Sequence, residues 1–248
     1  MTTTDTLTTD PTDNPSATAA TPPAPARQRW LLGRYDYPVS HRIFEVAVVA
    51  TFAGFAATFG RRVVAALADG WRWWSVLTLA VVVTLAYALA DLLSGLVHFA
   101  FDNLGSPETP VIGQKFVKPF RDHHADPAAM THGDLIAVNG DNVFASLLIL
   151  LPAWFALDVA EHAYGGAFLL ALLAGIIATN QIHKWCHTSS VPAWVRTAQQ
   201  RGLILSPRHH AVHHRAPHQR HYCITWGRLD RIVDRIGARA TRGRPPVV

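Results

Sequence analysis

The residues best suited to chemistry are the histidines between positions 183 and 218. Seven of the chain's 14 histidines lie in this stretch. The spacings i, i+4 and i, i+3, i+4 put the members of each set on one face if the segment is helical: His183 and His187, then His210, His213 and His214. A neutral imidazole keeps a lone pair free near pH 7, which makes histidine the commonest metal ligand in proteins. The stretch therefore predicts a metal site.

Further histidines upstream enlarge the predicted donor set. His98 ends an apolar run, and His123 and His124 are adjacent in the polar segment that follows it. With His218 as a ninth candidate, this is more than one ion accommodates, since a zinc site rarely takes more than four protein ligands. We expect two metal ions. Nitrogen donors alone do not choose between iron, zinc, copper and nickel.

The elements that must position these histidines are membrane helices. Half of the residues are hydrophobic and only 16% are charged, which is low for a soluble protein. Four apolar runs predict spans at about 43–59, 73–98, 143–157 and 164–182, each near the length that crosses a bilayer. The first run is short, and a buried amphipathic helix is the alternative for it. We expect an all-α integral membrane protein with four transmembrane helices and a histidine-rich cap.

Charge distribution predicts the orientation of these spans. An even number of spans puts both termini on one side of the membrane. All but three of the 22 lysines and arginines then fall on that side, the exceptions being Arg61, Arg62 and Arg72. The positive-inside rule makes that side cytosolic. The termini and the histidine motifs are therefore expected to face the cytosol, whereas His162 lies on the opposite side.

The flanking segments differ from the membrane domain expected over residues 30–237. Residues 1–29 are rich in Thr, Pro, Ala and Asp without apolar periodicity, which predicts a disordered tail. Residues 238–248 form a basic C-terminal tail. Two cysteines, Cys186 and Cys223, imply no disulfide framework. No aromatic residues interleave with the arginines as single-strand binders need, so we expect no nucleic-acid partner.

Polar residues near the histidines are candidates to hold the imidazole rings. Metal-binding histidines usually donate their second ring N–H to a carboxylate or carbonyl, which fixes the ring's tautomer and angle. The candidates for this role are Asp91, Asp102, Asp122, Asp126, Asn139, Asp141 and Asn180. Helix capping or a turn is the alternative for such residues, and it is favoured for Asp126 and Asp134.

The membrane setting favours one reaction class. A hydrolytic zinc site needs a general base beside its ligands, as in HExxH, but Lys, Trp and Cys separate His183 from His187. Two iron ions at the cytosolic end of a membrane bundle instead suit O2 activation against the C–H bond of a lipid chain. We assign no catalytic acid or base beyond the metal ligands. A metal-binding or haem-binding membrane protein without catalysis is the alternative, although most of the histidines lie outside the spans.

Five strings carry a resemblance to a known family. They are DLLSGLVHFAFDNLGS (91–106), FRDHHADPAAMTHGD (120–134), NGDN (139–142), NQIHKWCHTSSVPAWV (180–195) and PRHHAVHHRAPH (207–218). Their order and spacing resemble the Kua family of lipid desaturases over roughly residues 30–237. This family includes plasmanylethanolamine desaturases of animals and bacteria and a plant plastid branch that acts on phosphatidylglycerol.

The resemblance implies an O2-dependent di-iron lipid desaturase. In the plasmanyl branch, the substrate is an ether phospholipid whose 1-O-alkyl chain gains the vinyl ether double bond of a plasmalogen. Electrons come from a donor of cytochrome b5 or ferredoxin type. The alternative is a fatty-acyl desaturase or hydroxylase on another lipid, such as phosphatidylglycerol. The family's essential histidines match the nine named above, and its acidic residues match Asp91, Asp102 and Asp126.

The chain departs from the family pattern in two places. The family commonly has His directly before the residue that is Asp134 here, but this chain has Gly133, with His132 one position earlier. A family pattern like CITTGWLN reads CITWGRLD at residues 223–230, with Trp226 and Arg228 as departures. If this second segment contacts the lipid or the electron donor, specificity differs from that of the animal enzymes.

Overall fold

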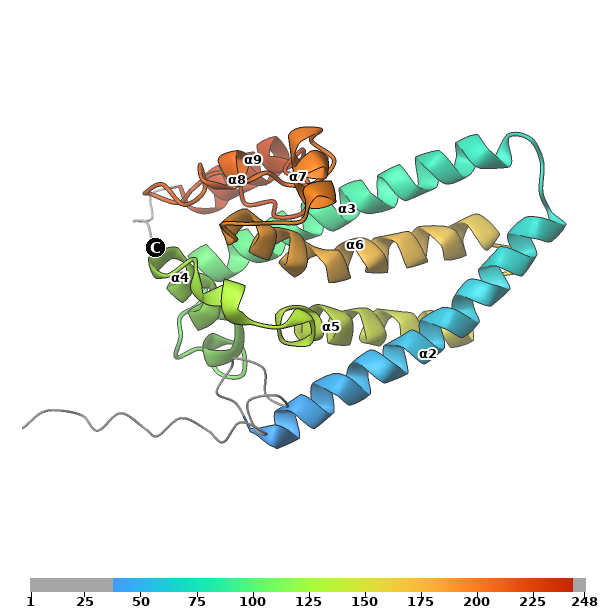
Figure 1. Cartoon of the computed structure of the whole chain (residues 1–248), viewed down its shortest axis with the longest axis horizontal. Coiled ribbons are helices and arrows are strands. Elements are labelled where there is room, and N and C mark those ends of the chain that lie inside the picture. Colours follow the sequence, from blue (N-terminus) through green and yellow to red (C-terminus); the bar gives the residue numbers. More distant parts are fainter. Residues whose placement is uncertain (1–37, 243–248) are drawn as a thin grey trace, which may run out of the picture.

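The computed structural model describes residues 38–242, and this part of the chain is helical without a β-strand. Four helices are long and apolar enough to cross a membrane (Figure 1). They are α2 (Val39–Asp69), α3 (Ser75–Asn103), α5 (Leu135–Ala156) and α6 (Ala163–His187). The prediction of an all-helical fold with four spans is confirmed. The tail predicted over residues 1–29 lies outside the described residues.

The long helices extend beyond the apolar runs that predict them. Helix α2 continues through Arg61 and Arg62 to Asp69, and the Arg62 guanidinium donates to the backbone carbonyls of Trp154 and Leu157. Helix α5 includes the NGDN segment (139–142), which lies before the span predicted at about 143–157. Its start is set by Asp134, whose side chain accepts the Ala137 N–H at 2.9 Å as an N-cap. Because the end of α2 and the start of α5 contain polar residues, the apolar runs place the predicted end of α2 too early and the predicted start of α5 too late.

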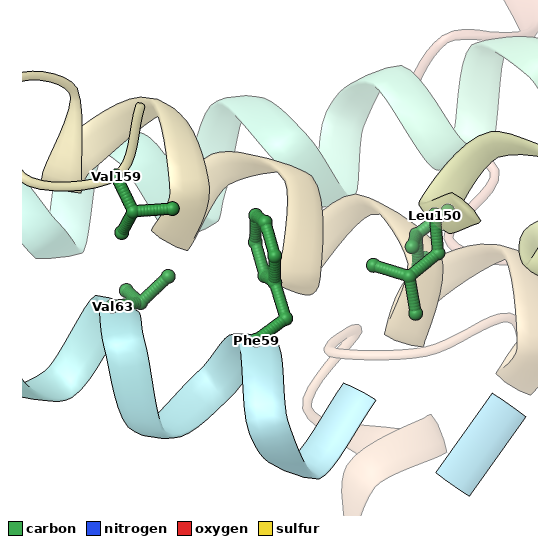
Figure 2. Close-up of a cluster of buried hydrophobic side chains, with 5 residues drawn as sticks. Phe59, Val63, Leu150 and Val159 are labelled. Carbon is green, nitrogen blue, oxygen red and sulfur yellow. The ribbon is translucent and has the colours of Figure 1, made fainter. Parts of the chain in front are cut away.

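The bundle packs as two helix pairs, α3 against α6 and α2 against α5, with α6 also contacting α2 and α5. Figure 2 shows part of its core, where Phe59 and Val63 of α2 meet Leu150 and Val159. The outward faces remain apolar, as burial against lipid rather than water requires. Exposed large hydrophobic residues on these faces include Val64, Leu77, Val81, Leu85, Leu148 and Phe155.

Short elements gather where α3 and α6 end (Figure 1). Between α3 and α5 lie a π-helix (Gly113–Val117), α4 (Lys118–Ala125) and a 3-10 helix (Ala129–His132). After α6 come α7 (Ala193–Gln200), α8 (Pro207–His210) and α9 (Asp230–Ala240). We call residues 188–242 the C-terminal cap. Helix α9 includes the first residues of the predicted basic tail, so that tail begins as ordered structure.

Two features of α3 hold the cap in place. Asp91 is fully buried, and its two carboxylate oxygens accept four backbone N–H bonds from residues 226–229 at 2.7, 2.9, 3.1 and 3.1 Å. At Gly95, a Cβ atom would lie 2.6 Å from the Cys223 Sγ and 2.9 Å from a methyl group of Val233. Only glycine therefore allows the cap to approach α3 this closely.

Candidate metal centre

Nine histidines from four parts of the chain converge at the end of the bundle where α3 and α6 terminate. The rings form two groups of potential metal donors with ligand atoms within 4.8 Å of one another. The first group is His123, His183, His187, His210 and His214, and the second is His98, Asp102, His124 and His213. Sequence neighbours are divided between the groups: His123 and His214 belong to the first, while His124 and His213 belong to the second.

The first group has the spacing of ligands around one ion. Its Nε2 atoms approach one another at 2.8–3.3 Å in six pairs. With metal–nitrogen bonds of about 2.1 Å, adjacent ligand atoms at a right angle lie about 3.0 Å apart. The His187 ring is 4.7–5.1 Å from each of the other four rings, whereas His123 and His210 are 6.4 Å apart and nearly parallel. His187 therefore lies at the apex of a five-nitrogen arrangement, with His123 and His210 on opposite sides.

The second group combines three imidazoles with a carboxylate. The Nε2 atoms of His98 and His213 are 3.1 Å apart. One oxygen of Asp102 lies 3.5 and 3.4 Å from these two nitrogens, and its other oxygen lies 3.2 Å from the Nε2 of His124. Asp102 is predicted from the sequence to hold a ring in place. In the structure its oxygens face the Nε2 atoms of three histidines, so it is also a potential metal donor itself.

Backbone carbonyls orient the two deepest rings of this group. The Nδ1 of His98 is 3.0 Å from the Tyr222 carbonyl oxygen, and the Nδ1 of His213 is 2.8 Å from the Arg220 carbonyl oxygen. A carbonyl oxygen only accepts, so each Nδ1 carries the proton and each Nε2 keeps its lone pair for a metal. The cap segment 220–222 thus fixes the tautomers of both ligands.

His218 contacts the second group from the cap. Its Nδ1 lies 3.1 Å from the Nδ1 of His124 and 3.0 Å from the His213 carbonyl oxygen. His218 is the ninth histidine of the cluster. Its ring contacts the His124 ring, but it does not belong to the set of potential donors in the second group.

The electrostatics of the site favour a bound cation. Burial, reinforced by the neighbouring imidazoles, lowers the pKa of His123 to about 2 and the pKa of His214 to about 3. These rings are therefore neutral at pH 7 and keep their lone pairs. Both oxygens of Asp102 are buried without a hydrogen-bond partner among the described residues. A buried carboxylate in that state is costly, and a metal ion among the donors would neutralise it. The residues therefore fit the metal centre that their sequence spacing predicts.

The other predicted ring-holding residues have different partners. Asp91 binds the cap loop, Asp122 pairs with Lys118, and Asp141 pairs with Lys115 at 3.0 Å. Asn139 donates to the Leu135 carbonyl, and Asn180 donates to the Val138 carbonyl. Asp126 ends α4, where its N–H donates to the Asp122 carbonyl. In the described contacts, none of these six side chains meets a histidine ring.

The groups that hold the His98 and His213 rings are backbone carbonyls, and a pattern of side chains in the sequence does not predict such contacts. The Arg220 and Tyr222 carbonyls could not be found from residue types. His132, at the departure from the family pattern, lies in the 3-10 helix outside both donor groups of the described chain. The neighbouring Gly133 carbonyl accepts a hydrogen bond from the Lys184 ammonium at 2.5 Å, which ties this segment to α6.

An apolar cavity of about 640 Å³ lies between α2, α5 and α6. On α6 it is lined by residues that share one helix face: Leu170, Ala174, Ile177, Gln181 and Trp185. His183 and His187 project from the opposite face of the same helix. Helix α6 therefore separates this cavity from the first donor group.

The membrane bundle and its two donor groups are those of an integral membrane protein with a histidine-rich candidate metal centre. The lipid desaturase domain model matches residues 87–239, which includes all nine histidines. The chain belongs to the lipid desaturase domain family. The resemblance seen in the sequence motifs is thereby confirmed.

Curated relatives support this membership. The chain is 41% identical over 172 residues to plasmanylethanolamine desaturase 1 of Mus musculus, covering 66% of this chain and 64% of the mouse protein. It is 36% identical over 196 residues to plasmanylethanolamine desaturase of Myxococcus xanthus, covering 79% and 68% of the two chains. Fatty acid desaturase 4, chloroplastic, of Arabidopsis thaliana is 35% identical over 152 residues, covering 60% and 45%. No solved structure matches the chain.

Proposed function

We propose that this protein is a plasmanylethanolamine desaturase, which converts the 1-O-alkyl chain of an ether phospholipid into a vinyl ether. The observation that carries the proposal is the pair of buried donor groups at the ends of membrane helices in a chain of the lipid desaturase domain family. Two relatives named for this activity, at 41% and 36% identity, support the choice of substrate.

The depth of the donor groups suits the bonds to be oxidised. A helix needs roughly 20 residues to cross the hydrocarbon core. His98 is the 24th residue of α3, and His183 is the 21st residue of α6. The first potential ligands therefore come just beyond one hydrocarbon thickness. The C1 and C2 atoms of a 1-O-alkyl chain lie beside the glycerol, at this same membrane boundary.

The reaction removes one hydrogen from C1 and one from C2 and forms the C1=C2 double bond. One O2 accepts these two hydrogens together with two electrons and two protons from outside and leaves as two waters. We propose one iron ion in each donor group, which would supply the O2 chemistry when bound. We propose that the electrons come from a donor of cytochrome b5 or ferredoxin type.

The chain's own residues hold and shield this chemistry. The Arg220 and Tyr222 carbonyls keep the Nε2 lone pairs of His213 and His98 directed inward. Asp102 supplies the carboxylate that balances the charge of a bound cation. His98, Asp102 and His213 are fully or almost fully buried, so the second group is shielded from bulk water.

We further propose that the donor groups and both termini face the cytosol, as the distribution of basic residues supports. A cysteine reporter tests this orientation. The native Cys223 is unsuitable because it is fully buried, and burial raises the pKa of its thiol. Gln219 is exposed on the cap. A Gln219→Cys protein should react with a membrane-impermeant maleimide only after the cells are opened, and labelling of intact cells would contradict the orientation.

Lipid mass spectrometry tests the function. The protein is expressed in a host that makes ether lipids but no plasmalogens, and acid-labile vinyl ethers should accumulate. His183→Ala is the matched inactive control. The likeness to fatty acid desaturase 4 of Arabidopsis favours one second candidate, a desaturase of an acyl chain on another lipid such as phosphatidylglycerol. A new acyl double bond with no vinyl ether would support that candidate and contradict the first.

A further inference from the structure

A third cluster of potential metal donors lies in the cap, separate from the two histidine groups. It contains His209, His221 and Asp230. Neither histidine is among the nine metal-ligand candidates predicted from the sequence. We infer that these three residues bind an additional divalent transition-metal ion.

The Asp230 carboxylate is directed at both rings. Asp230 is buried, and its Oδ1 accepts the Cys223 N–H at 2.7 Å. Its Oδ2 lies 2.6 Å from the Nε2 of His209 and 3.9 Å from the Nδ1 of His221. The hydrogen bond between the His209 Nε2 and the Asp230 Oδ2 satisfies only part of this arrangement, because the Nδ1 of His221 is buried without a hydrogen-bond partner among the described residues. One divalent ion would join all three side chains.

The backbone is shaped to bring the two rings together. His221 has a φ of 61°, a left-handed conformation that is unfavourable for a residue with a Cβ atom. Its N–H is held by the Asp234 Oδ1 at 3.0 Å. Gly227 also has a positive φ, and a Cβ there would lie 2.8 Å from the His209 Nε2. The ring centroids of His209 and His221 end 4.3 Å apart.

The donor set defines the class of ion. Two imidazole nitrogens and one carboxylate oxygen suit zinc and other first-row divalent ions. The His209 and His221 side chains are 35% and 27% exposed, so water completes the coordination. An ion here would also brace the site, because His221 stands between Arg220 and Tyr222, whose carbonyls orient His213 and His98. This inference does not depend on the proposed reaction.

Zinc stoichiometry tests the inference. The full chain in detergent is stripped with a chelator and re-equilibrated with Zn²⁺, and bound zinc per chain is measured after gel filtration. His221→Phe and Asp230→Asn should each bind one equivalent less than the parent. Asp230→Asn keeps the side-chain shape and an oxygen acceptor for the Cys223 N–H. His162→Phe, an exposed histidine at the other end of the bundle, is the matched control and should bind as the parent does.

A second background separates this ion from the main centre. In a His183→Ala chain, adding Asp230→Asn should still remove one equivalent. Equal zinc content in the parent, His221→Phe and Asp230→Asn would overturn the inference. His209 and Asp230 would then only stabilise the cap through their hydrogen bond. Vinyl ether production is scored separately, so failure of the desaturase proposal and failure of the third metal site give different results.

Discussion

Replacing Asp91 should release the cap from the bundle. This buried carboxylate accepts four backbone N–H bonds from residues 226–229, two at each oxygen. A net loss of roughly 1 kcal/mol for each bond, the central value for protein hydrogen bonds, makes Asp91→Ala about 4 kcal/mol less stable. Total stabilities are about 5–15 kcal/mol, so this is a large fraction of the whole. For a chain of this size it lowers the melting temperature by about 8–16 °C.

Asp91→Asn should give about half of that effect. The amide oxygen can still accept the pair of N–H bonds at one position, whereas the amide NH2 faces the other pair without accepting them. The expected loss is therefore about 2 kcal/mol. Because the cap carries His210, His213 and His214, metal content should fall in the same order as stability: parent, Asn variant, Ala variant.

The assay is thermal unfolding in detergent together with metal analysis of the same samples. Asp158→Ala is the control, since Asp158 is an exposed carboxylate that accepts one N–H, from Ala160, at 2.9 Å. Its melting temperature should stay within about 4 °C of the parent, the shift produced by losing one such bond. If Asp91→Ala melted as the Asp158 variant does and kept its full metal content, Asp91 would not be the anchor of the cap.

Three further predictions concern the donor groups and their support. His183→Ala or His213→Ala should abolish desaturation and the metal loading of the histidine group to which the residue belongs, without preventing membrane insertion. Lipid analysis, metal analysis and membrane fractionation measure these outcomes, and full activity in either variant would contradict the proposed metal centre. Metal-free protein should lose thermal stability as the pH falls from about 6.5 to about 3. The reason is that the unfolded chain protonates His123 and His214 in this range, whereas burial keeps both rings neutral in the folded chain; a melting temperature independent of pH there would contradict this electrostatic argument. Gly95→Val should cost at least about 1–3 kcal/mol by overpacking against Cys223 and Val233, whereas Gly54→Val, where a Cβ meets nothing within 4 Å, should be nearly neutral in the same unfolding assay.

The sequence predicts the parts of this protein that depend on periodicity. Apolar runs predict the four spans, and the i, i+4 spacing of His183 and His187 places both on one face of α6, where both belong to the first group of potential donors. It does not predict helix ends. The sequence favours capping or a turn for Asp134, and Asp134 does cap α5, which begins at Leu135. The polar NGDN residues after the cap hide this start, so the apolar run alone places it near residue 143.

The division of the histidines into groups also depends on three-dimensional contacts. Asp91 and Asp102 are both acidic residues of α3 with similar surroundings in the sequence. Asp91 meets four backbone amides of the cap, whereas Asp102 meets three imidazoles. The difference depends on which segments fold back onto each turn of α3. Contacts made by backbone N–H and C=O groups leave no signature in residue type. The sequence therefore could not show that Asp91 anchors the cap, whereas Asp102 lies among the potential metal donors.

The distribution of neighbouring histidines couples the two donor groups. His123 and His124 share one turn of α4 but serve different groups, and the same holds for His213 and His214 in the cap. Any movement of either segment therefore changes the ligand spacing in both groups at once. The second group is additionally tied to segment 220–222 through the Nδ1 atoms of His98 and His213. The cap therefore contributes potential donors to both groups, and Asp91 and Gly95 support the candidate metal centre by holding the cap against α3.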